Sequence, residues 1–283
     1  MKGVRDFFLH LRLNYNFLIL SAPFFLGALY LPRIENIKSF IFLYLLMYVF
    51  LFGGVNAYNS YFDKDEGPIG GLEHPPKMKR WMLYVSICFQ IIALVLAMLV
   101  GYIYSIFMLL AMGLSWLYSN PKMRFKAKPA LSFLVIGVGT VFIPALFGYF
   151  IAGGSNISVD FLAGIFGTTF IVLSMYPFSQ AYQIEEDKKK GDITFAVKYG
   201  TQGVKNNSLI LFPLGILFLT YSFLSSTTLV VAALIIGIPA YILLWQVVKS
   251  ISGNRVEYKR VMMAKYYGGA TFTLAILILA TLF

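Results

Sequence analysis

The sequence predicts an all-α polytopic membrane protein, with about nine transmembrane helices in one bundle around a central cavity. Of its 283 residues, 59% are hydrophobic and only 12% are charged, whereas about 25% are charged in an ordinary soluble domain. Apolar stretches of about 20 residues recur along the chain, the length that a helix needs to cross about 30 Å of hydrocarbon. These observations exclude a soluble globular enzyme. No internal repeat or long loop interrupts the pattern, so residues 1–283 are expected to form a single transmembrane domain.

Nine apolar segments follow one another in the chain. The first could be mistaken for a secretory signal peptide, but no small-residue cleavage site follows it and Pro32-Arg33 ends it, so we expect it to remain as a helix. The third and fourth segments are separated only by residues 100–102. The expected spans are Leu13–Leu31, Phe40–Tyr61, Trp81–Gly101, Tyr102–Ser119, Leu131–Ala152, Phe161–Tyr182, Leu209–Leu224, Thr228–Val248 and Val261–Phe283.

The basic residues are distributed unevenly between the two sides of this topology. The net charge is +11, yet all the Lys and Arg except Arg33 and Lys38 fall in or next to loops on one side. This asymmetry is typical of the cytoplasmic side of a membrane protein. It predicts an integral protein of the bacterial inner membrane with a cytoplasmic N-terminus and cytoplasmic active-site loops. It also accounts for the charge without nucleic acid, so we expect membrane lipids and no nucleic acid as partners.

The end of the second segment carries the first group of polar residues. Asn56, Asn59 and Asp63 are spaced three and four apart and would lie on one helix face, and Asp65 and Glu66 follow directly. Amide and carboxylate oxygens suit Mg²⁺, which takes one or two carboxylates together with substrate phosphates. A solvated helix end followed by a turn is the alternative.

The end of the sixth segment repeats this arrangement. Gln180, Gln183 and Asp187 have the same spacing, and Glu186 lies one step around the helix. Two oxygen-bearing faces at the same side of the membrane indicate a shared Mg²⁺ site. The alternative is an ordinary charged loop, in which the acids are balanced by the lysines at 188–190.

The loop after the fourth segment is basic and contains no acid. Tyr118 and Lys122 are one helical turn apart, and Arg124 and Lys126 follow in a loop bounded by prolines. Such cations can bind phosphate oxygens, although they could also serve only the topological bias. Anion-binding cations opposite metal-binding acids are what a diphosphate requires.

Together these motifs resemble the UbiA superfamily of intramembrane prenyltransferases over nearly the whole chain. The resemblance rests on the acidic motif after the second segment, the Tyr-x-x-x-Lys loop after the fourth, and the second acidic motif followed by Gly-x-x-Thr. Two positions depart from the family pattern. Gly67 occupies the third position of the first motif, and Gln183 replaces the first acid of the second motif.

The resemblance implies a Mg²⁺-dependent enzyme that ionises a prenyl diphosphate and transfers the prenyl group to a hydrophobic aromatic or lipid acceptor. Asp63, Asp187, Lys122 and Tyr118 would be catalytic. Lys122, Arg124 and Lys126 would bind the diphosphate. The metal would be held by Asn59, Asp63, Asp65, Glu66, Gln183, Glu186 and Asp187. Polar residues of the acceptor side or cavity would be Arg12, Asn14, Asn16 and Asn56.

Two other functions compete with this one. A terpene synthase of the same fold would capture the cation within its own chain and need no acceptor. A secondary transporter would need ionisable groups near the middle of the membrane or an internal repeat, and neither is evident in the sequence.

Overall fold

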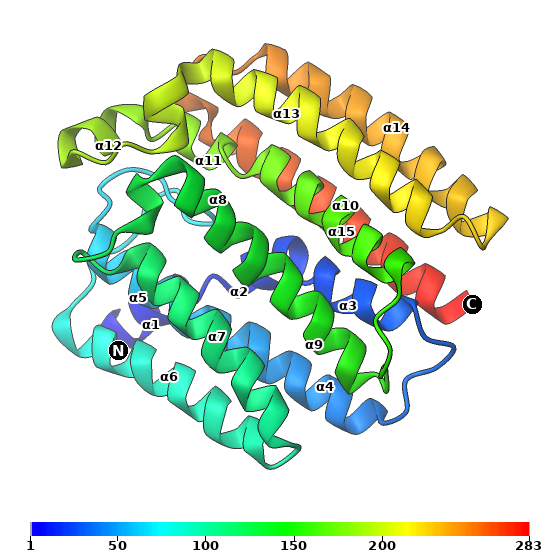
Figure 1. Ribbon diagram of the computed structural model, residues 1–283. Coiled ribbons are helices and arrows are strands. Elements are labelled where there is room, and N and C mark those ends of the chain that lie inside the picture. Colours follow the sequence, from blue (N-terminus) through cyan, green and yellow to red (C-terminus); the bar gives the residue numbers. More distant parts are fainter. Residues whose placement is uncertain (1, 283) are drawn as a thin grey trace.

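The computed structural model describes residues 2–282. Within them the regular secondary structure is helical, with no strand and one isolated bridge between Ile69 and Leu72. Eight helical segments of the described chain are long and apolar enough to cross a membrane. They run side by side between two ends of the molecule (Figure 1). The predicted all-α polytopic bundle is therefore confirmed.

The eight segments correspond to the second through ninth predicted spans. In chain order they are Ile37–Asp63 (α4 Ile37–Leu45, π-helical η2 Leu46–Leu51, α5 Phe52–Asp63), α6 Arg80–Met98, α7 Tyr102–Ser119, Pro129–Ile151 (α8 Pro129–Gly137, π-helical η4 Val138–Phe142, α9 Ile143–Ile151), Val159–Ala181 (α10 Val159–Met175, α11 Phe178–Ala181), α13 Phe195–Ser222, α14 Thr227–Lys249, and Tyr258–Leu279 within α15 Tyr258–Leu282. The short α1 Lys2–His10, η3 Phe125–Ala127, α12 Ile184–Lys190 and η5 Arg255–Glu257 lie outside these segments.

The first predicted span is helical but broken. It consists of α2 (Leu13–Tyr15), the π-helical η1 (Asn16–Leu20) and α3 (Ala22–Leu29). Pro23 restricts the start of α3, because proline has no N–H to continue the preceding helix. The break keeps this segment below the length of a spanning helix, which is why eight helices qualify instead of nine.

A buried polar contact holds the broken segment inside the bundle. Asn16 is fully buried, and its Nδ2 donates to the carbonyl oxygen of Tyr48 at 2.8 Å. Its Oδ1 accepts from Asn56 Nδ2 at 2.7 Å. Because an unpaired amide in hydrocarbon is costly, these bonds fix the segment against η2 and α5.

Helices α3 and α9 approach each other closely through glycines. A Cβ on Gly148 would overlap the carbonyl oxygen of Phe24, and one on Gly27 would overlap that of Ala145. Small residues allow such backbone contact between membrane helices. The Phe24 ring packs beside that of Phe147, with centroids 5.9 Å apart.

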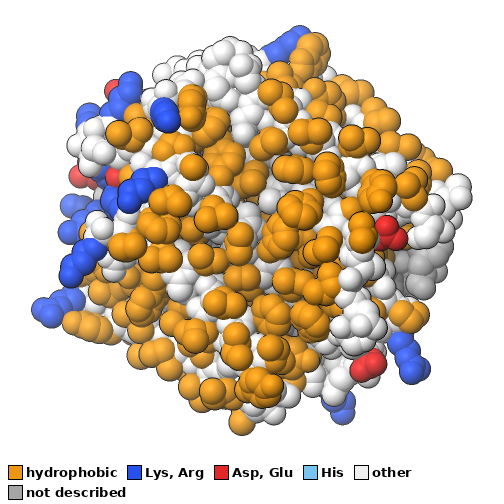
Figure 2. Space-filling model, in the orientation of Figure 1, with side chains coloured by type: hydrophobic (Ala, Val, Ile, Leu, Met, Phe, Trp, Pro, Cys, Tyr) orange, Lys and Arg blue, Asp and Glu red, His pale blue; other side chains and the backbone are white. Residues whose placement is uncertain are grey.

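The charged side chains lie at the two ends of the bundle. Figure 2 shows hydrophobic side chains across the middle of the visible face, with most Lys and Arg at the end that carries α12 and the N-terminus. Helix α15 ends at the opposite end (Figure 1). The end rich in basic residues also brings together the C-terminus of α5, η3 and α12, which carry the three motifs.

Candidate active site

A cavity of about 900 Å³ extends from the basic end into the apolar interior. This volume is within the usual range for a binding site of a small ligand, about 300–1,000 Å³. Its polar end is lined by members of all three motifs, and its deeper walls by aliphatic and aromatic side chains. The polar lining includes Arg12, Asn56, Asn59, Asp63, Asp65, Tyr118, Lys126, Gln180, Gln183 and Asp187.

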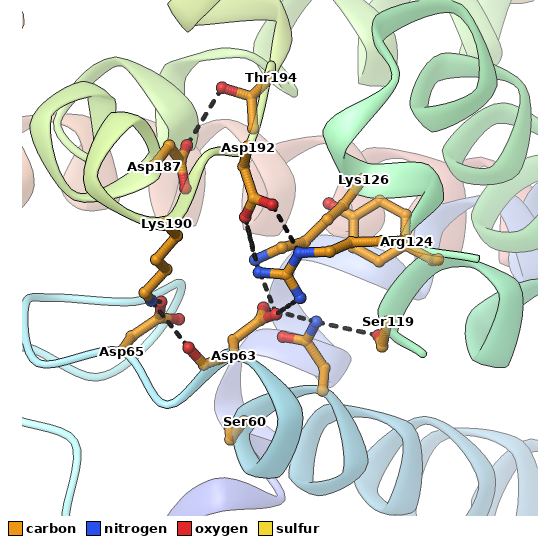
Figure 3. Close-up of polar contacts among 12 residues, drawn as sticks. Ser60, Asp63, Asp65, Ser119, Arg124, Lys126, Asp187, Lys190, Asp192 and Thr194 are labelled. Carbon is orange, nitrogen blue, oxygen red and sulfur yellow. Dashed lines mark hydrogen bonds and ion pairs between the residues drawn. The ribbon is translucent and has the colours of Figure 1, made fainter. Parts of the chain in front are cut away.

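Asp63 is the last residue of α5 and is buried at this polar end. Its Oδ1 lies 2.7 Å from Lys126 Nζ and 3.6 Å from Arg124 Nη1. Its Oδ2 accepts a hydrogen bond of 2.9 Å from Asn59 Nδ2. Figure 3 shows the Asp63 carboxylate directed toward the two basic side chains.

The basic loop is fixed from its other side by Asp192. Arg124 Nε and Nη2 donate to the two carboxylate oxygens of Asp192 at 2.5 and 2.7 Å. Lys126 Nζ lies 3.5 Å from Asp192 Oδ2. Burial disfavours the charged form of Lys126, but the carboxylates of Asp63 and Asp65 outweigh it and raise the pKa of the ammonium. Lys126 therefore remains cationic at the cavity wall.

Asp187 projects from α12 on the other side of the polar end (Figure 3). Its Oδ2 accepts a 3.1 Å hydrogen bond from Thr194, which also caps the N-terminus of α13. Burial raises the pKa of Asp187 to about 7, and the proximity of Lys126 only partly offsets this. The carboxylate is thus short of positive charge in its present surroundings.

The loop between α5 and α6 is attached to α12 over the polar end. Lys190 Nζ bonds to Asp65 and lies 3.0 Å from Glu186 Oε1. The Glu186 carboxylate accepts the backbone N–H groups of Glu66 and Gly67 at 2.9 and 3.1 Å. Glu186 therefore holds the loop, and the Glu66 side chain is exposed.

Within the described part of the chain, carboxylates outnumber the cations in this region. Among the described residues, Asp187 has no ion-pair partner within 4.0 Å, and burial together with the Asp63 charge raises the pKa of Asp65. No three Asp, Glu, His or Cys side chains of residues 2–282 converge into a ready-made metal cluster. The oxygen donors at the polar end nevertheless suit a hard cation that takes its remaining ligands from water and substrate. The ion pairs join Arg124, Lys126 and Lys190 to Asp63, Asp65, Glu186 and Asp192.

Tyr118 lines the cavity beside this network. Its hydroxyl lies 3.0 Å from that of Tyr176, which comes from α10–α11. Arg12 also lines the cavity and donates to Ser60 Oγ at 2.5 Å. Arg12 adopts a left-handed conformation with φ of 50°, which directs the chain from α1 into α2.

Six of the residues predicted from the sequence lie outside the cavity lining. Lys122 and Asn14 are exposed, because the turn after α7 and the first turn of α2 direct them outward. Arg124 and Glu186 lie behind the cavity wall. Arg124 bonds to Asp192, and Glu186 bonds to the α5–α6 loop. The six residues are Asn14, Asn16, Glu66, Lys122, Arg124 and Glu186.

Sequence reasoning missed three residues of this region. Asp192 and Lys190 looked like members of a charged loop, and only the fold shows what they contact. Lys265 lines the cavity from α15 and is 6% exposed. A lone Lys inside an apolar span was a usable signal, since ionisable residues in such segments are often functional.

The chain belongs to the UbiA prenyltransferase family, whose sequence profile matches residues 20–269. This confirms the resemblance inferred from the three motifs. No curated protein matched the sequence.

Solved structures show the same fold at low sequence identity. A UbiA homolog from Archaeoglobus fulgidus bound to GPP and Mg²⁺ is 18% identical, with a TM-score of 0.76, covering 98% of this chain and 99% of that chain. The same protein bound to Cd²⁺ is 18% identical, with a TM-score of 0.71 and the same coverage. A structure concerning digeranylgeranylglyceryl phosphate synthase is 18% identical, with a TM-score of 0.65, and each chain is covered completely.

Proposed function

We propose that this protein ionises a prenyl diphosphate within the membrane, with Mg²⁺, and transfers the prenyl group to an aromatic or lipid acceptor. One observation carries the proposal. The polar end of the cavity, here called the mouth, contains Asp63, Lys126 and Asp187 and continues into the apolar part of the same cavity of about 900 Å³. A prenyl diphosphate has the same division into a charged head and an apolar tail. Family membership and the fold shared with a homolog solved with GPP and Mg²⁺ support it.

The charges of the mouth explain why a divalent cation is needed. Among the described residues, Arg124, Lys126 and Lys190 form ion pairs with four carboxylates, and Asp187 adds a fifth. A diphosphate would add further negative charge to a region already rich in acids, which is unfavourable without compensation. Asp63, Asp65 and Asp187, with the amide oxygens of Asn59 and Gln183, would hold Mg²⁺, which when bound supplies charge neutralisation to the leaving diphosphate.

The basic side chains act on the same leaving group. Lys126 reaches the cavity directly, and it would donate to diphosphate oxygens as negative charge accumulates on them. Asp192 lies closer to Arg124, at 2.5 Å from Nε, than to Lys126, at 3.5 Å from Nζ. Arg124 therefore keeps Asp192 from neutralising Lys126 fully. The C–O bond to the diphosphate breaks, and the electron pair leaves with the phosphate.

The deeper cavity protects the allylic cation that remains. Its walls include the rings of Phe52, Phe212 and Phe223. Aromatic faces stabilise positive charge, and an apolar wall limits capture by water. The acceptor then attacks the cation carbon, and the proton that it loses passes to the released diphosphate or to a carboxylate of the mouth.

The test is an incubation of the purified protein with Mg²⁺ and geranyl, farnesyl or geranylgeranyl diphosphate, with and without a membrane-lipid extract or an aromatic acceptor. Diphosphate release and extracted products are analysed by mass spectrometry. Asp63→Asn and Asp187→Asn should abolish turnover, whereas Glu185→Gln, an exposed acid on the same helix as Asp187, should retain it.

The products separate the two chemistries of this fold. Prenyl adducts that form only when acceptor is present establish the transferase. Cyclised or rearranged hydrocarbons formed without acceptor, and lost in both Asp variants, would make the protein a terpene synthase. Absence of any diphosphate release under all conditions would reject both.

A further inference from the structure

Lys190 lies where the α5–α6 loop meets α12, a contact here called the junction (Figure 3). Its Nζ donates to the carbonyl oxygen of Asp63 at 2.8 Å, to Glu186 Oε1 at 3.0 Å and to Asp65 Oδ1. An ammonium group has three donors, so oxygens from three different elements satisfy all of them. The Lys190 side chain is 22% exposed, whereas those of Asp65 and Glu186 are 10% and 8% exposed.

The oxygens around Lys190 Nζ are of the kind that a hard divalent cation takes as ligands, namely two carboxylates and a backbone carbonyl. The carbonyl belongs to Asp63, the last residue of α5. Carbonyl groups at a helix C-terminus have no partner in the helix, and the helix dipole favours positive charge there. The carboxylates of Asp65 and Glu186 contact the same Nζ and would repel each other without a cation between them. The junction therefore requires a positive charge, and the chain itself supplies it.

The two positions that depart from the family motifs lie at the same junction. Gln183 Nε2 donates to the carbonyl oxygen of Pro68 at 3.1 Å. The Gly67 N–H donates to Glu186 Oε2 at 3.1 Å. A carboxylate at position 183 has no N–H to donate and would repel the Pro68 carbonyl, and an acidic side chain at position 67 would place a further negative charge beside Glu186. Both departures thus fit a junction that is held by hydrogen bonds and one ammonium group.

The other side of the mouth has no corresponding cation. Asp187 lines the cavity, and it has no ion-pair partner among the residues that the structure describes. Lys190 and Glu186, by contrast, are not part of the cavity lining. The charge of Lys190 is therefore committed to the junction, and the acid that still lacks a cation is the one that faces the cavity.

We propose that Lys190 takes the place of a second divalent cation, so that the mouth binds a single metal ion together with the diphosphate. This inference rests on the proposed function and specifies the metal requirement of that same site. The single ion lies beside Asp187 and Asp63. Lys190 keeps the α5–α6 loop on α12 whether or not metal is bound, so this part of the mouth is formed before the substrate enters.

The first experiment counts bound metal and does not depend on turnover. Mn²⁺ is titrated into the purified protein with a non-ionising thiolodiphosphate analogue of geranyl diphosphate, and free Mn²⁺ is measured by electron paramagnetic resonance. The variants are Lys190→Ala, Lys190→Arg and the control Lys188→Ala. Lys188 is an exposed lysine of the same helix that pairs with the exposed Glu185.

The wild-type protein, Lys190→Arg and Lys188→Ala should each bind about one Mn²⁺ per chain, whereas Lys190→Ala should bind about two, because the oxygens left around the missing ammonium suit a hard cation. Binding of two ions by the wild-type protein would overturn the inference. A count that stays at one in Lys190→Ala would also overturn it, because the oxygens around Lys190 would then not be a cation site.

The second experiment tests the junction without any substrate. A Glu-specific serine protease cleaves the α5–α6 loop after Glu66 or Glu73, and the Lys190 variants leave these sites unchanged. The wild-type cleavage rate in EDTA should be within about twofold of the rate in Mg²⁺, because the loop is held by protein contacts. Lys190→Ala should be cleaved about tenfold faster than wild type in EDTA, the effect of losing one charged hydrogen bond, and Mg²⁺ should restore its protection.

The outcomes of the two experiments separate this inference from the proposed function. Protection of the wild-type loop that requires Mg²⁺ would overturn the inference while leaving the proposed function intact. Failure of the wild-type protein to bind the diphosphate analogue would reject the proposed function, and the proteolysis then decides the role of Lys190 by itself. If Lys190→Ala does not fold, the wild-type metal count and the wild-type cleavage rates decide between the two outcomes.

Discussion

Replacing Lys126 by Met should reduce stability and activity together, because this ammonium neutralises Asp63 and contacts the substrate site. Its Nζ lies 2.7 Å from Asp63 Oδ1, and both side chains are less than 10% exposed. Breaking a buried ion pair costs about 3–5 kcal/mol. Arg124 and Asn59 still support Asp63, so we expect about 3 kcal/mol. The melting temperature should then fall by about 6–12 °C.

The effect on catalysis should be larger than the effect on stability. Removal of one group that stabilises charge in the transition state usually lowers kcat about 10²- to 10³-fold. Lys122→Met is the matched control: this lysine is in the same loop but is exposed, so we expect less than a threefold change in diphosphate release.

A double-mutant cycle tests the cause of the destabilisation. Asp63→Asn removes the charge that Lys126 neutralises, so the melting temperature of Asp63→Asn/Lys126→Met should exceed the value expected from adding the two single effects. Diphosphate release should remain lost in the double variant. Strictly additive losses of stability would refute the reasoning, because they would mean that the two charges are not coupled.

Three further predictions concern Asp187, the helix contact at Gly148 and the α5–α6 loop. Burial raises the pKa of Asp187 to about 7, whereas the ordinary pKa of an aspartate is about 4. The stability that the Asp187 proton contributes is therefore present below about pH 4 and is lost as pH rises through 7. Asp187→Asn should melt higher than wild type at pH 8 but not at pH 4, and equal differences at both pH values would contradict this. Gly148→Ala should destabilise by about 1–3 kcal/mol through overlap with α3, whereas Gly113→Ala on α7, with open space around it, should be neutral or stabilising in the same melting assay. Glu186→Gln should weaken the two bonds to backbone N–H groups and speed proteolysis within residues 64–79; an unchanged cleavage rate would show that the loop is held by other contacts.

The apolar spans and the order of the motifs were the parts of this protein that could be predicted from sequence. Helix α7 occupies the predicted range Tyr102–Ser119, because a continuous apolar run bounded by Gly101 and Pro121 leaves little choice. Helix α13 begins at Phe195, well before the predicted Leu209. Thr194 caps its first turn, Gly200 with a φ of 66° interrupts it, and the mostly polar residues 201–207 precede the apolar stretch, so hydropathy does not detect this start.

The site was predictable in its location but not in its pairings. Asp63 and Asp187 both line the cavity. Asp63 ends α5 on the expected helix face, whereas the chain breaks between α11 and α12, so Asp187 is placed by α12 and not by one continuous helix with Gln180. Lys122 and Lys126 were both expected at the diphosphate, but the turn at 120–124 carries Lys122 outward, and only Lys126 lines the cavity. Pairing across elements, as between Arg124 and Asp192, depends on tertiary packing and has no local signal.

The central claim is that a prenyl diphosphate binds with its head at the mouth formed by α5, η3 and α12. The most direct measurement is an experimental structure of the protein with a non-ionising thiolodiphosphate analogue of geranyl diphosphate and Mn²⁺, whose anomalous scattering marks the metal. The account predicts diphosphate oxygens in contact with Lys126, metal beside Asp63 and Asp187, and the tail among Phe52, Phe212 and Phe223. A head group held at the exposed Lys122, or metal bound away from both aspartates, would contradict it.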